Sequence, residues 1–70
     1  MRFTRHAKNK ARWLRMSLAD VEGVIAHPAH MGRDEDGKPQ YVGEVRGVSV
    51  RVVLALDEPD LIVTIHRRRH

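Results

Sequence analysis

The feature that most constrains the fold is the segment YVGEVRGVSVRVVLAL at residues 41–56, where apolar or small residues recur at every second position. Such alternation turns one face of a strand toward the core and the other toward solvent. The Arg46-Gly47 pair interrupts it, and a two-residue link between alternating runs is typical of a tight β-hairpin. The segment therefore predicts two antiparallel strands, with Val45 paired to Val48.

A third strand, LIVTIHR at residues 61–67, follows the loop DEPD. If Leu56 pairs with Leu61 across this loop, Arg51 stands directly opposite His66. One face of the predicted sheet is then apolar and should pack on helices: Tyr41, Val45, Val48, Val50, Val52, Leu54, Leu56, Leu61, Val63 and Ile65. The other face is mixed and open: Val42, Glu44, Ser49, Arg51, Val53, Ala55, Ile62, Thr64, His66 and Arg68.

Two helices are predicted before the strands. Residues 4–15 place Ala7, Ala11 and Leu14 on one buried stripe, at the spacing of a helical face. The sequence SLAD at 17–20 is typical of a capping box, in which Ser and Asp side chains bond the free N–H groups of a helix start. This second helix should end at His27-Pro28, because the residue before proline avoids the helical region.

These elements predict an α+β fold with two N-terminal helices on one face of a three-stranded antiparallel sheet, in the order ααβββ. The 70 residues form a single domain, 1–70. The chain has no cysteine and no long apolar run, so we expect a cytoplasmic protein without disulfides or membrane contact. A domain this small buries a modest fraction of its surface, and exposed sheet edges would suit a homodimer or a partner strand.

Positive charge is concentrated at the two ends of the chain. Thirteen Lys and Arg face nine Asp and Glu, and residues 2–15 contain six of these cations, His6 and no acid. The tail HRRRH at 66–70 repeats the pattern. Segregated positive charge favours a polyanion, because each neutralised phosphate releases counterions. We therefore predict RNA as the partner, bound by Lys8, Lys10, Arg12, Arg15, Arg67 and Arg68.

The open sheet face carries the side chains that metal-independent RNA cleavage requires. Histidine transfers protons near neutral pH, and arginine matches two phosphate oxygens. The predicted catalytic residues are His6, Arg51, Thr64 and His66, with no cofactor and no metal. Charged residues on a solvated strand face are also common for solubility alone, and Trp13 is expected to pack at the helix–sheet edge rather than to stack on a base.

The order of several short motifs resembles a known family. F-T-x-H-A near the N-terminus, S-x-x-D-V, a proline-ended second helix, Tyr-x-Gly, G-x-x-x-R-V-V and I-V-T span Phe3 to about His66. This order is similar to small prokaryotic domains of unknown function grouped with the RelE/ParE and BrnT toxins, of the barnase–EndoU–colicin–RelE fold. Relatives tend to have Arg at positions 10 and 14 and Gly at position 15.

The resemblance implies a ribonuclease-like scaffold, often a toxin neutralised by an antitoxin, with functional positions at His6, Arg51 and Thr64. The first hypothesis is therefore an RNase-like toxin that acts without metal, using histidine as acid or base and arginine on the phosphate. The alternative is a non-catalytic RNA-binding or protein-interaction module on the same scaffold.

Overall fold

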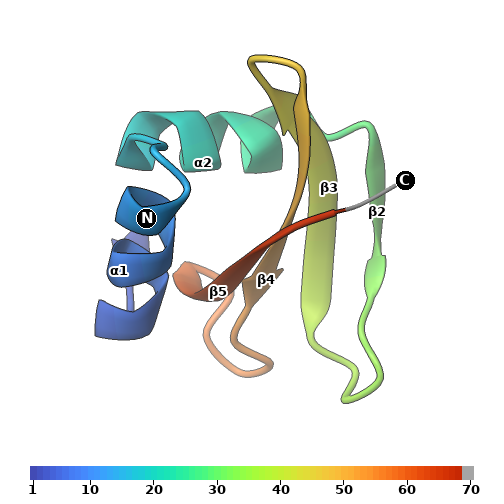
Figure 1. Cartoon of the computed structure of the whole chain (residues 1–70). Coiled ribbons are helices and arrows are strands. Elements are labelled where there is room, and N and C mark those ends of the chain that lie inside the picture. Colours follow the sequence, from blue (N-terminus) through green and yellow to red (C-terminus); the bar gives the residue numbers. More distant parts are fainter. Residues whose placement is uncertain (69–70) are drawn as a thin grey trace.

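The computed structural model describes residues 1–68; Arg69 and His70, the last two residues of the predicted basic tail, lie outside the described part. Two helices cover one face of a twisted five-stranded sheet (Figure 1). In chain order the elements are β1 (Arg2–Phe3), α1 (Arg5–Trp13), α2 (Leu18–Ala26), β2 (His30–Arg33), β3 (Pro39–Val45), β4 (Val48–Leu54) and β5 (Leu61–Arg67).

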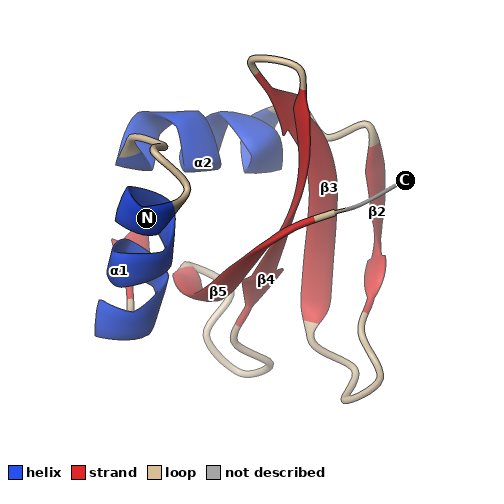
Figure 2. Cartoon of the chain, in the orientation of Figure 1, coloured by secondary structure: helices blue, strands red, loops and turns tan. Residues whose placement is uncertain are grey.

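The α+β class fits, but the prediction of a three-stranded antiparallel sheet is wrong. Figure 2 shows β5, β4, β3 and β2 following one another across the sheet. The full strand order is β1-β5-β4-β3-β2, and β1 runs parallel to β5, so the sheet is mixed. The two missed strands lie at opposite edges and have two and four residues. Neither shows alternation, because β1 is too short and all four residues of β2 are exposed. Main-chain bonding to β5 and β3 holds them in the sheet, and a hydrophobic pattern does not report that bonding.

The predicted hairpin register is confirmed, since Val45 pairs with Val48 and the β3–β4 ladder continues from there. The β4–β5 register is confirmed as far as Arg51 opposite His66 and Val53 opposite Thr64. Beyond that point a β-bulge shifts the pairing by one residue, so that Leu54 faces Ile62 instead of Val63.

The bulge changes which residues are buried at this end of the sheet. Ile62 was expected on the open face but is fully buried in the core. Leu56 was expected in the core but is 60 % exposed. A one-residue shift exchanges the two faces of β5 beyond the bulge, and this accounts for Ile62. Leu56 lies past the end of β4 at Leu54, outside the paired strand.

The core lies between the helices and the sheet. α1 packs mainly on β5 and α2 mainly on β3. The predicted capping box is confirmed: the Ser17 hydroxyl accepts from the Asp20 N–H at 3.0 Å, and the Asp20 carboxylate accepts from the Ser17 N–H at 2.9 Å. The buried cluster comprises Ala7, Ala11, Met16, Val21, Val24, Val45, Val50, Val52, Leu54, Ile62 and Ile65.

Candidate nucleic-acid interface

The start of α1 is fastened to the bulged part of β5 by Thr4. Its hydroxyl accepts from the Ala7 N–H at 3.0 Å, which caps the helix, and donates to the Val63 carbonyl at 3.2 Å. The Thr4 N–H donates to the Ile62 carbonyl at 3.0 Å. α1 therefore begins directly beside β5, and its first turn lies next to the strand.

This arrangement brings His6 to Thr64. The Nε2 atom of His6 lies 3.1 Å from the Thr64 hydroxyl oxygen, within hydrogen-bonding distance. One helical turn further along α1 is Lys10, and two residues further along β5 is His66. Four helical residues and two strand residues both advance about 6 Å, so Lys10 reaches the level of His66.

His66 lies among three cationic or ionisable neighbours. It stands opposite Arg51 in the sheet, and Lys10 and His6 lie on the helix beside it. Burial, followed by repulsion from Arg51, Lys10 and His6, lowers the pKa of His66 below its ordinary value of 6.5. The imidazole is therefore neutral at neutral pH and able to accept a proton.

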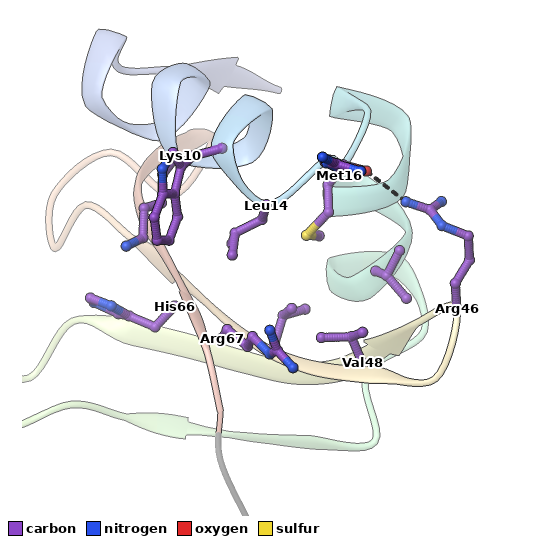
Figure 3. A pocket seen from close by; sticks show the side chains of 11 residues that line it. Lys10, Leu14, Met16, Arg46, Val48, His66 and Arg67 are labelled. Atoms are coloured by element: carbon purple, nitrogen blue, oxygen red, sulfur yellow. Dashed lines mark hydrogen bonds between the residues drawn. The ribbon is translucent and has the colours of Figure 1, made fainter.

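Beyond Lys10 the helix ends before the strands do, and a groove opens there. Nine helical residues rise only about 14 Å, whereas seven strand residues extend about 23 Å. The groove has a volume of about 650 Å³ between the end of α1, the β3–β4 turn and the last residues of β5 (Figure 3). Its apolar lining consists of Leu14, Met16, Val45, Val48 and Val50.

The rest of the groove lining is aromatic or basic, and none of the residues that line it is acidic: Lys10, Trp13, Arg15, Arg46, His66 and Arg67. Within residues 1–68, Lys10, Arg15 and Arg67 form no ion pair, whereas Arg46 pairs with Asp20 at 2.9 Å. The groove therefore presents uncompensated positive charge beside apolar surface.

Two arginines of the groove have an unusual backbone. Arg15 has φ 58° and Arg46 has φ 49°, and they are the two non-glycine residues of the described chain with positive φ. Arg15 ends α1 in a Schellman motif, in which the Met16 N–H donates to the Ala11 carbonyl at 2.9 Å. Arg46 occupies the first position of the two-residue hairpin turn. Glycine or asparagine is usual at both kinds of position, and another residue costs about 1–2 kcal/mol there.

The Arg46 side chain connects these two positions. Its guanidinium donates to the Arg15 carbonyl at 2.7 Å and to the Asp20 carboxylate at 2.9 Å, and the first of these bonds is drawn in Figure 3. The β3–β4 turn is thereby held against the junction of the two helices. Arg46 was not predicted as a site residue. The sequence feature that could have identified Arg46 is a charged residue at a turn position that requires positive φ.

The predicted RNA-binding residues are distributed over more than one surface. Lys10, Arg15 and Arg67 line the groove. Lys8 and Arg12 line a separate hollow between α1 and the start of α2, and Arg12 and Arg15 also line a third. Arg68 is exposed just past β5, and its N–H donates to the Ser49 carbonyl at 2.9 Å.

Of the four predicted catalytic residues, His6 meets Thr64 and His66 meets Arg51, but the four do not line one cavity. Arg51 lines a different hollow, formed with Gln40 and the acidic turn at residues 34–36. Its Nε atom is buried without a hydrogen-bond partner. His66 is the member of the set that lines the groove.

Trp13 is the clearest departure from expectation at this site. It was expected to pack at the helix–sheet edge, but it is 76 % exposed. The Lys10 ammonium lies 5.1 Å from the centroid of its ring, a cation–π distance. An exposed aromatic ring beside cations is available to a ligand.

Comparison with known proteins gave no match to a protein-family model, a curated protein or a solved structure. Among residues 1–68, no three His, Asp or Glu side chains gather closely enough to hold a metal ion. The helices of this part of the chain are too short and too polar to cross a membrane.

Proposed function

We propose that this protein binds RNA in the cationic groove and cleaves it without a metal, as a small toxin-type ribonuclease acting in the cytoplasm. The observation that carries the proposal is the position of His66. Burial and the charges of Arg51 and Lys10 lower the pKa of its imidazole, which favours the neutral form, and the residue lines the groove. The resemblance of the sequence to the RelE/ParE and BrnT toxins predicts the same class of function.

In the proposed reaction, neutral His66 takes the proton from a ribose 2′-hydroxyl, and the 2′-oxygen forms a bond to phosphorus. The bond from phosphorus to the 5′-oxygen breaks, and that oxygen takes a proton from His6. The products are a 2′,3′-cyclic phosphate and a 5′-hydroxyl. Lys10 and Arg67, which line the groove, stabilise the negative charge on the phosphate. Arg51 acts through His66 by lowering its pKa from the opposite strand, and Thr64 orients the His6 ring.

A non-catalytic RNA-binding module is the second candidate, and the placement of Arg51 favours it. Arg51 lines a hollow separate from the groove, and its Nε atom is buried. A groove lined by Lys10, Arg15 and Arg67 can hold phosphates without any contribution from Arg51. The edge strand β2, exposed at every residue, would serve a homodimer or an antitoxin strand in either case.

The test is cleavage of single-stranded RNA in the presence of EDTA, with product ends identified by mass spectrometry. We expect the wild type to leave 2′,3′-cyclic phosphates, and His66→Ala to reduce the rate about 100-fold or more, since general base catalysis typically contributes about 10²–10⁴. His6→Ala should reduce it by a similar factor. Expression of the wild type should slow cell growth, whereas expression of His66→Ala should not.

Arg2→Gln is the matched control, because Arg2 is paired with Asp60 and Glu58 rather than placed in the groove. It should cleave at the wild-type rate. If the wild type binds RNA in a salt-dependent manner but produces no cyclic phosphate ends, the ribonuclease is excluded and the binding module remains. Circular dichroism of each variant establishes that it is folded.

A further inference from the structure

The groove contains apolar side chains in addition to the cations that a phosphate site requires. A phosphate is bound by cations and N–H groups, and Lys10, Arg15 and Arg67 supply the cations. Five apolar side chains line the same groove. Met16, Val45 and Val50 belong to the buried core, whereas Leu14 is half-buried and Val48 is 37 % exposed. Apolar surface left open between the layers of a small domain is unfavourable unless something covers it.

The groove and Trp13 together match the two surfaces of a nucleobase. A base has flat apolar faces that stack on aromatic rings and apolar side chains, and a polar edge that reaches solvent. The volume of about 650 Å³ is within the range of roughly 300–1,000 Å³ common for ligand clefts. The Lys10 ammonium lies over one face of the Trp13 ring, 5.1 Å from its centroid, so a base would stack on the other face with its phosphate within reach of this cation.

The two arginines with positive φ both line this groove. Arg15 lies just past the end of α1, and the Arg46 guanidinium donates to the Arg15 carbonyl at 2.7 Å. Both positions favour glycine or asparagine, so their occupation by arginine works against folding. Strained positions of this kind cluster at sites of function. Here Arg15, which forms no ion pair within residues 1–68, adds a cation to the groove, and Arg46, paired with Asp20, holds the β3–β4 turn against the Arg15 carbonyl.

We propose that the groove accepts one unpaired nucleobase of single-stranded RNA, stacked against Trp13, with the adjacent phosphates on Lys10, Arg15 and Arg67. This inference rests on the proposed RNA binding and narrows it to a substrate class. Bases of duplex RNA are stacked on one another, and their faces are covered. Duplex RNA would therefore contact only the cationic side chains of the groove and place no base against Trp13.

Trp13 is the only tryptophan of the chain, so intrinsic fluorescence reports directly on the groove. The full chain is titrated with three probes of equal length: single-stranded 2′-O-methyl RNA, its duplex, and an abasic oligonucleotide. The 2′-O-methyl group blocks cleavage and separates binding from catalysis. We expect the single strand to quench Trp13 and to bind about tenfold more tightly than the abasic probe, as base–aromatic stacking provides.

Fluorescence anisotropy of labelled probes supplies a second readout. Trp13→Leu should weaken binding of the single strand about tenfold and leave the abasic probe unchanged. Leu56→Ala, which removes an exposed apolar side chain outside the groove, should change neither.

Two results would overturn the inference, and they differ in what they leave standing. Equal, salt-dependent affinity for all three probes without quenching would exclude base docking but keep RNA binding by charge. Absence of binding to every probe would remove both the docked base and the proposed function.

Discussion

The two helices have the same length and lie on the same face of the sheet, but they differ in what they contribute. α2 buries Val21 and Val24, and Val24 packs so closely on β3 that a Cβ added at Gly43 would lie 3.1 Å from its Cγ1. α1 buries only Ala7 and Ala11. α2 therefore supplies much of the helical apolar burial, whereas α1 approaches the sheet through small side chains and presents Lys10 and Trp13 to the groove.

The largest effect is expected from Val21→Ala in α2, which tests whether α2 supplies the apolar burial that stabilises the fold. Val21 is fully buried, and removing two methyl groups should lower the free energy of unfolding by about 2 kcal/mol. Urea denaturation followed by circular dichroism measures the change. Lys8→Ala, at an exposed position of α1, should stay within about 0.5 kcal/mol of the wild type. Similar losses for both variants would show that the helices do not differ in this way.

Arg15→Gly tests the claim that the end of α1 is built for binding at the expense of stability. Glycine relieves the left-handed strain but gives the unfolded chain more freedom, so the net gain should be about 0.5–1 kcal/mol. RNA affinity should fall, because a groove cation is lost. Arg12→Gly, two residues before the helix C-cap at Leu14, should instead cost about 1 kcal/mol. Urea denaturation curves of the two variants measure these changes. A loss of stability in both Arg15→Gly and Arg12→Gly would contradict the claim that Arg15 is strained.

The smallest expected effect concerns His66, which faces α1. Its pKa is lower in the folded chain than the ordinary 6.5, so the unfolded chain binds more protons below that pH. Stability from this group is therefore present above pH 6.5 and is lost as the pH falls through the lowered pKa. The carboxyl pKa values of Asp20 and Asp60 are also lowered, but from 3.8, so their losses come at more acidic pH.

Urea midpoints at about pH 7.5 and about pH 5.5 should differ less in His66→Gln than in the wild type. NMR titration of the His66 ring should give a midpoint below 6.5 that rises when RNA is added, because phosphates offset the charges of Arg51 and Lys10. A midpoint above 6.5 in the free protein would contradict the assignment of His66 as a neutral base.

Local chemistry determined which parts of the fold the sequence could predict. The hairpin at Arg46-Gly47 and the cap at Ser17 follow from local chemistry and were predicted correctly. The bulge near Val63 was not predicted, because Leu61, Ile62 and Val63 are three consecutive apolar residues without alternation. Short edge strands held by main-chain bonds leave an equally weak pattern.

The candidate site was only partly accessible to sequence analysis. The register of β4 and β5 predicted the meeting of Arg51 and His66. The groove arises from the shortness of α1 relative to the strands, which the hydrophobic pattern does not report. Val48 was therefore assigned to the core, although it is 37 % exposed and lines the groove, whereas the assignment of Val50 to the core is confirmed. The positions of Arg15 and Arg46 were visible as charged residues at places that favour glycine. Their connection to a binding site becomes evident only in the structure, where both residues line the groove.

The fastening of the chain start to β5 has a consequence for biosynthesis. Arg2 pairs with Asp60, and Thr4 bonds the carbonyl of Val63, so α1 acquires its place only after β5 exists. Residues 5–13 leave the ribosome before β5, the strand on which they dock. A partly synthesised chain therefore holds the cations without the groove. If the protein cleaves RNA, a chain still being translated therefore cannot act as a nuclease until residue 67 has been synthesised.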